Sequence, residues 1–94
     1  MWVLSDAAIG DLDVMVAWGA RTFGYRQVEK YQSRIVDMFD TLALNPELAP
    51  QRQSAAGLVR VMPCGAHHIV YRVENEAVAI LRVLHHLQGW PDEL

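Results

Sequence analysis

The first half of the chain holds two stretches in which apolar residues recur at helical spacing. In the first stretch these residues are Ile9, Leu12, Met15, Val16, Trp18 and Phe23. A spacing of three and four places them on one face of an α-helix, with Ser5 as its N-cap and Gly24 as its C-terminal stop.

The second stretch runs from Tyr25 to Leu44 and is the clearest helix of the chain. Its apolar face consists of Val28, Tyr31, Ile35, Met38, Phe39 and Leu42. Asn45-Pro46 ends it, because the residue before a proline avoids helical backbone angles. Two helices separated by a single glycine predict a helical hairpin with a shared apolar seam.

The remaining segments have the composition of β-strands. Residues 1–4 are short and apolar, and residues 47–56 read as a polar connector without periodicity. Three later segments are rich in Val, Ile and Leu and are separated by turn signals: residues 58–62, 66–73 and 77–84. This order predicts an α+β domain, with an N-terminal strand, a helical hairpin and then a three-stranded antiparallel meander.

A hairpin turn around Asn75 would assign the two faces of the last two strands. Counting outward from that turn pairs Val73 with Ala77, Arg72 with Val78, Val70 with Ile80 and His68 with Arg82. The face with Ile69, Tyr71, Leu81 and Val83 is then apolar and should pack on the helices. The opposite face mixes apolar and basic side chains: His68, Val70, Arg72, Val78, Ile80, Arg82 and Leu84. Such a mixture is typical of a surface that docks another chain; the alternative is two arginines that solubilise an exposed face.

Composition narrows the classes of function. The 94 residues fit one domain, 1–94, and 52% hydrophobic with 20% charged residues suit a packed core. A formal charge of −3 argues against direct binding to DNA by the chain alone. The sequence has no apolar stretch near the ~20 residues that span a bilayer and no signal peptide, and its single cysteine excludes an internal disulfide. We therefore expect a cytoplasmic domain that uses no membrane.

Catalytic and metal-binding motifs are not evident. Each of the pairs His67-His68 and His85-His86 offers one ligand per face, because neighbours on a strand point to opposite sides. Cys64 has no base fixed beside it. For metal-free RNA cleavage, arginines could stabilise the phosphorane, but only His68 or His85 could serve as acid or base. The sequence favours a binding module over an enzyme, with no cofactor, metal or catalytic residue.

Several fragments, taken in order, resemble the ParE branch of the RelE/ParE toxin superfamily over nearly the whole chain. They are Leu4-Ser5 with Ala8, Asp11 and Leu12; Phe23-Gly24; residues 42–48 (LALNPEL); residues 60–63 (RVMP) with Gly65 and His67; residues 69–73 (IVYRV); residues 80–85 (ILRVLH); and Trp90-Pro91. Each fragment is weak alone, and the set in this order and spacing is specific.

The resemblance implies a toxin of a type II toxin–antitoxin system with the compact α+β fold of that family. It implies a hetero-oligomer with a cognate antitoxin, of the ribbon-helix-helix, ParD-like kind, and DNA gyrase as the target. It places Arg82, His85 and Trp90 where the C-terminal end matters for toxicity. The antitoxin tail is expected on the mixed face, at His68, Val70, Arg72, Val78, Ile80 and Arg82.

The chain departs from the family pattern at two places. Ala66 stands where many relatives have arginine, and residues 86–89 (HLQG) replace a more polar ending. Two alternatives therefore stay open beside gyrase inhibition. One is a RelE-like, ribosome-dependent mRNA endonuclease, and the other is a degenerate toxin that retains only antitoxin binding.

Overall fold

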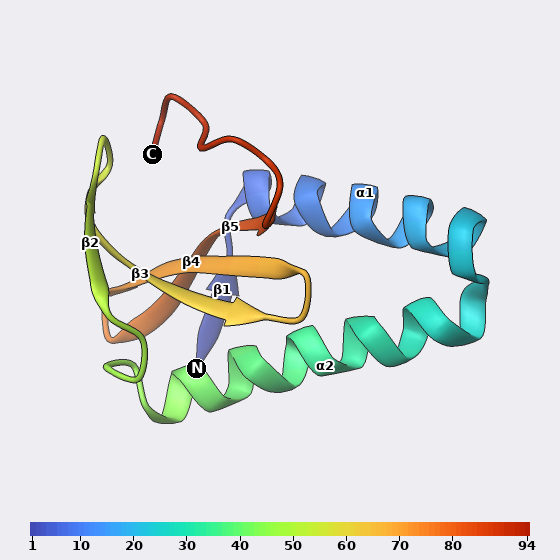
Figure 1. The fold of residues 1–94 in the computed structure, drawn as a ribbon. Coiled ribbons are helices and arrows are strands. Elements are labelled where there is room, and N and C mark those ends of the chain that lie inside the picture. Colours follow the sequence, from blue (N-terminus) through green and yellow to red (C-terminus); the bar gives the residue numbers. More distant parts are fainter.

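The structure, a computed structural model that describes all 94 residues, confirms the α+β class. Its elements in chain order are β1 (Trp2–Leu4), α1 (Asp6–Phe23), α2 (Tyr25–Leu44), β2 (Gln51–Ser54), β3 (Gly57–Cys64), β4 (His67–Glu74) and β5 (Ala77–His85). The two helices form a hairpin that lies against one face of the sheet and extends well past its edge (Figure 1). Neither helix is both long and apolar enough to cross a membrane.

The sheet is larger than the predicted meander. Five strands lie in the order β1-β5-β4-β3-β2, and β1 pairs with β5 in parallel, so that the sheet is mixed. The prediction of a three-stranded antiparallel unit was incomplete, because β2 lies inside the segment expected to be a connector. Its sequence, Gln-Arg-Gln-Ser, has no apolar alternation because it is an exposed edge strand that pairs with β3 alone.

The helix boundaries match the predictions because the capping residues are adjacent to the helices in the sequence. The Ser5 hydroxyl oxygen accepts a hydrogen bond from the Ala8 amide at 3.0 Å and donates one to the Leu81 carbonyl at 2.7 Å. The cap therefore also fastens the start of α1 to β5. Gly24 adopts φ +88°, a conformation that glycine tolerates, and turns the chain between the helices.

The predicted register of the last hairpin was wrong by one residue next to the turn. Asn75 and Glu76 form a two-residue turn, both with positive φ, so that Val73 pairs with Val78 and Tyr71 with Ile80. Val78 and Ile80 consequently belong to the core under the helices and not to the opposite face, because a one-residue shift exchanges the faces of a strand.

A bulge restores the predicted faces further along β5. The register shifts beside Val70, which pairs with Arg82, and Leu81 is left without a partner on β4. Val83 then faces the helices as predicted, whereas Leu84 lies on the other side with Val70. Leu81, expected under the helices, contributes to that opposite side.

The opposite face of the sheet is not open. Val59, Val70 and Leu84 are each at most 2% exposed there, and Trp90 and Leu94 pack against them. These two residues belong to the C-terminal strap, defined here as residues 86–94, which runs back across the molecule from the end of β5 (Figure 1). The face expected to receive a partner is therefore covered by the chain itself.

Candidate partner-binding site

An apolar groove opens where the helical hairpin extends past the sheet. Its volume is about 510 Å³, and both helices, the β3–β4 turn and the end of β5 line it. Val14, Trp18 and Phe23 line it and are 70%, 52% and 63% exposed. The Trp18 and Phe23 rings pack edge to face, 5.5 Å apart between centroids. The sheet is too short to cover these side chains, and the exposed apolar surface is typical of a site for a protein partner.

The groove is narrow at its base because the helices meet closely there. Gly19 of α1 is buried, and a β-carbon at that position would lie 2.8 Å from Cγ2 of Val28 on α2. The groove thus lies between the two helices and the ends of β4 and β5, and its apolar lining suits the apolar side of an amphipathic partner helix.

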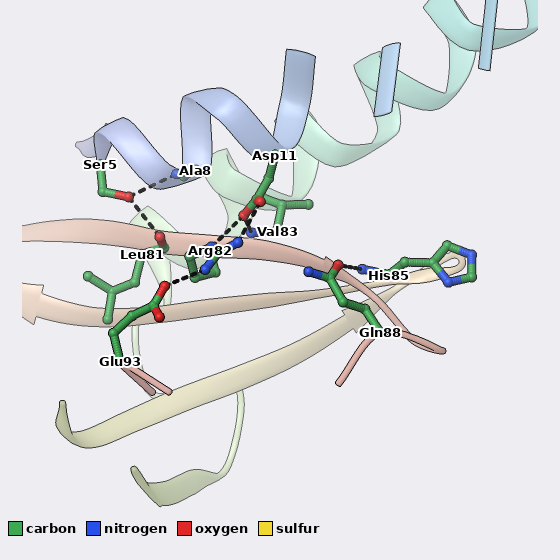
Figure 2. A network of polar contacts seen from close by, with 9 residues as sticks. All are labelled: Ser5, Ala8, Asp11, Leu81, Arg82, Val83, His85, Gln88 and Glu93. Atoms are coloured by element: carbon green, nitrogen blue, oxygen red, sulfur yellow. Dashed lines mark hydrogen bonds and ion pairs between the residues drawn. The ribbon is translucent and has the colours of Figure 1, made fainter. Parts of the chain in front are cut away.

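A cluster of charges joins α1, β5 and the strap (Figure 2). Arg82 donates through Nε and Nη2 to the two carboxylate oxygens of Asp11, both at 2.8 Å, and through Nη1 to Glu93 at 2.6 Å. Asp11 also accepts from the Val83 amide at 2.9 Å. The Arg82 and Asp11 side chains are only 14% and 13% exposed, and the hydrogen bonds that Arg82 donates to Asp11 raise the pKa of Arg82.

This cluster closes the edge of the sheet. β1 pairs with β5 only as far as Ile80, which leaves the amides beyond it without a neighbouring strand. Asp11 accepts the Val83 amide in place of a strand carbonyl. Arg82 is therefore an internal tie between helix and sheet, and its guanidinium is not free for a partner.

A second polar cluster forms the wall of the groove at the ends of β4 and β5. The Tyr31 hydroxyl, which accepts from the Ala66 amide at 2.9 Å, lies 2.6 Å from Nδ1 of His67. The rings of His67 and His85 are 5.3 Å apart between centroids. Burial lowers the pKa of His67, and the neighbouring His85 adds to this effect.

The predicted toxicity residues divide between two surfaces. Arg82 and Trp90 lie at the strap side, where Glu93 connects Arg82 to the strap and the guanidinium carbon of Arg52 lies 3.7 Å from the centroid of the Trp90 ring. His85 faces the groove, and its Nδ1 accepts from the Leu87 amide at 3.2 Å. Of the three residues, only His85 lines the groove.

The predicted antitoxin residues are dispersed further. Val78 and Ile80 are in the helix-facing core, and Val70 is buried beneath the strap. Arg72 remains partly exposed, but Nε pairs with Glu74 at 2.6 Å and Nη1 donates to the Ala56 carbonyl at 2.6 Å. Arg72 and the half-buried His68 are the members of the predicted antitoxin-binding set that a partner can reach.

The sequence did not indicate which residues form the charge cluster around Arg82 and which line the groove. Asp11 lies on the buried stripe of α1, between Ala8 and Met15, and a carboxylate at such a position signals a buried partner. Nothing in the sequence around Glu93 indicated that this residue would pair with Arg82. Trp18 and Phe23 were assigned to the core, because periodicity shows which side chains share a face and not how far the sheet reaches beneath them.

His, Cys, Asp and Glu side chains are the candidate metal ligands of the chain, and Cys64 is its candidate nucleophile. No group of three or more His, Cys, Asp or Glu side chains is placed to hold a metal ion. Cys64 is buried, and that burial raises the pKa of its thiol, whereas a nucleophile needs the thiolate.

Comparisons with known proteins give one family and one similar fold. The family model described as the ParE toxin of the type II toxin–antitoxin system parDE matches residues 3–90. A solved structure described as the chromosomal ParDE TA system from P. aeruginosa is similar in fold, with a TM-score of 0.77 and 21% identity over 89% of this chain and 92% of that chain. No curated protein matches the sequence.

Proposed function

This chain belongs to the ParE toxin family of type II toxin–antitoxin systems, and from that membership we propose that it inhibits DNA gyrase by binding and is neutralised by a ribbon-helix-helix antitoxin. A toxin of a parDE system has a cognate antitoxin as its partner. The observation that carries the proposal is the groove, a concave and largely apolar surface at which Val14, Trp18 and Phe23 are exposed. Gyrase is a protein of the cytoplasm, which is the compartment that the proposal requires.

The antitoxin is proposed to place the apolar side of a helix in the groove. Val14, Trp18 and Phe23 expose apolar surface in the groove. Its burial against the antitoxin would stabilise the complex by roughly 25 cal/mol for each Å² removed from water. Gln27 and Gln88 on the groove lining offer amides to the polar side of such a helix. Arg72 and His68 remain predicted contacts for the part of the antitoxin that continues past the groove.

The antitoxin contact is tested by titrating purified toxin variants with the cognate antitoxin. We expect Trp18→Ala to weaken binding by at least tenfold, since truncation of an aromatic anchor at an interface commonly has that effect. Tyr25→Ala is the matched control, because Tyr25 is 74% exposed and does not line the groove. Equal affinities for both variants would rule out the groove as the antitoxin site.

The gyrase part of the proposal rests on family membership and on the C-terminal residues Arg82, His85 and Trp90. His85 is the most informative of these, because its replacement leaves the Arg82–Asp11 tie in place. A supercoiling assay with antitoxin-free protein should show inhibition that added antitoxin relieves. His85→Ala should lose inhibition, and because His85 also lines the groove, its antitoxin affinity is measured in parallel. Folded protein that leaves supercoiling unchanged would contradict the gyrase target.

One geometric feature favours mRNA cleavage as the second candidate. His67 and His85 place two imidazoles 5.3 Å apart at the groove wall, and a pair of imidazoles can supply both a general base and a general acid. Primer extension on cellular mRNA after induction separates the candidates. Codon-specific cuts would support the nuclease, and growth arrest without cuts would support gyrase inhibition. Antitoxin binding with no growth arrest would identify a degenerate toxin.

A further inference from the structure

The polar end of the groove presents hydrogen-bond donors for which the chain supplies no acceptor. The Leu87 amide donates to Nδ1 of His85 at 3.2 Å, so that the proton of the neutral His85 ring lies on Nε2. The His85 amide donates to Oε1 of Gln88 at 3.3 Å, and this contact leaves the NH2 group of Gln88 free (Figure 2). Both side chains line the groove, and neither Nε2 atom forms a hydrogen bond within the chain. This end of the groove is therefore complementary to an acceptor.

The groove contains no carboxylate that could satisfy these donors. Asp11 is the only acidic residue in its lining. Both oxygens of Asp11 accept from Arg82, and one of them also accepts from the Val83 amide. The guanidinium balances the charge of Asp11, which is thus not available to His85 or Gln88. A charged acceptor for these two residues has to come from a molecule that occupies the groove.

His67 stands beside His85, and its surroundings suit a charged ring as well as a neutral one. Nδ1 of His67 lies 2.6 Å from the Tyr31 hydroxyl, which accepts from the Ala66 amide and lies 3.3 Å from the Cys64 carbonyl. When His67 is neutral, the hydroxyl can donate its proton to Nδ1. When His67 is protonated, Nδ1 donates to the hydroxyl oxygen and the hydroxyl donates to the Cys64 carbonyl. Protonation of His67 therefore leaves each of these groups with a partner.

The titratable and charged groups around His67 come from every element that packs there: Asp11 on α1, Tyr31 and Arg34 on α2, Cys64 on β3, His68 on β4, His85 on β5 and His86 on the strap. Burial lowers the pKa of His67, and the neighbouring imidazoles lower it further. Asp11 raises this pKa, but Asp11 is paired with Arg82. Burial raises the pKa values of Tyr31 and Cys64, so that both stay neutral. The free toxin thus disfavours charge at His67, and a carboxylate brought to this place from outside would favour it.

We propose that the polar end of the groove, formed by His67, His85 and Gln88, binds a carboxylate side chain of the antitoxin helix, and that the two imidazoles take up a proton when it binds. The inference rests on the proposed function, which places that helix in the groove. The apolar side of the helix contacts Trp18 and Phe23, and the carboxylate fixes how far along the groove the helix lies. A charged acceptor suits this place better than a neutral one, because hydrogen bonds to an ionised group are stronger and the carboxylate also attracts the imidazolium.

Proton uptake makes the affinity rise as the pH falls. In the complex the carboxylate stabilises the charged ring, so that the pKa of His67 is higher there than in the free toxin. The antitoxin therefore binds more tightly as the pH falls through the pKa of the complex towards that of the free toxin. A difference of one pKa unit corresponds to about tenfold in the dissociation constant.

The test measures the dissociation constant of the toxin with its purified cognate antitoxin at about pH 8 and about pH 6, on either side of the usual range for histidine. We expect the unchanged toxin to bind about five- to tenfold more tightly at the lower pH. His85→Gln keeps a neutral amide donor but cannot be protonated, so its two affinities should differ by less than about threefold. His86→Gln is the matched control, because it removes the same ring from a residue that does not line the groove, and it should keep the full difference.

The carboxylate itself is identified on the antitoxin, in measurements that use the unchanged toxin. Each acidic residue of the antitoxin helix is replaced in turn by its amide, Glu by Gln and Asp by Asn, and binding is measured at both pH values. One replacement should abolish the pH dependence and weaken binding at the lower pH by roughly five- to tenfold. Against His85→Gln the same replacement should have a much smaller effect, because both changes remove one contact.

Three results would overturn the inference: equal affinities of the unchanged toxin at both pH values, equal pH dependence of His85→Gln and His86→Gln, or no amide replacement that removes the pH dependence. Trp18→Ala separates these results from a failure of the proposed function. If Trp18→Ala weakens binding and one of the three results is found, the groove holds the antitoxin and only the carboxylate contact is wrong. If Trp18→Ala leaves binding unchanged, the groove is not the antitoxin site and this inference falls with it.

Discussion

Replacing Asp11 with alanine should destabilise the fold far more than its place on a partly exposed helix suggests. The change removes both acceptors of Arg82 on α1 and leaves the Val83 amide without its partner. Breaking a fully buried ion pair costs about 3–5 kcal/mol. Since these side chains retain 13–14% exposure, we expect a loss of about 2–4 kcal/mol in the free energy of unfolding, or roughly 10–30 °C in Tm.

The assay is urea unfolding followed by circular dichroism, for Asp11→Ala, Asp11→Asn, Arg82→Met and the double variant Asp11→Ala/Arg82→Met. Asp11→Asn retains an oxygen for the Val83 amide and should lose about half as much stability. In the Arg82→Met background, Asp11→Ala should cost only about 1 kcal/mol, because no guanidinium is left without a partner. A coupling below about 0.5 kcal/mol in this cycle would refute the assignment of Arg82 as an internal tie.

Three further predictions concern backbone conformation and titration. Gly10→Ala should raise the free energy of unfolding by roughly 0.5–1 kcal/mol in urea, since nothing lies within 4 Å of the added carbon. Gly19→Ala should lower it, because the added carbon would collide with Val28. Equal effects of the two variants would contradict the close contact between the helices. Glu76→Gly should stabilise by about 1 kcal/mol, because it relieves a φ of +63° at the second turn residue, and an unchanged Tm would argue against that turn. Folding lowers the pKa of His67, so the unfolded chain binds a proton there at higher pH than the folded chain does. The free energy of unfolding should therefore fall as the pH drops below about 6.5 and through the lowered pKa of the folded chain. This fall should be steeper than in the His67→Gln variant.

Much of the candidate site could not be predicted because it depends on contacts between distant segments. Residues 11, 82 and 93 meet only when α1, β5 and the strap are in place. The helix ends could be predicted since Ser5 and Gly24 act within a few residues of themselves. The exchange of Val78 and Ile80 between faces came from the two-residue turn, and the bulge beyond them restored the predicted faces. Neither feature has a distinct sequence signal in a run of Val, Ile and Leu.

The sequence by itself determined the two helices, the hairpin of β4 and β5 and, through its ordered fragments, the family. These features depend on local periodicity, caps and turns, which act over a few residues. Only the tertiary structure decided which apolar surface stays exposed. The helical hairpin is longer than the sheet beneath it, so that Trp18 and Phe23 line an open groove, while the strap reaches the face that was expected to be free. Exposure depends on where separate elements end relative to one another, and no local pattern contains that information.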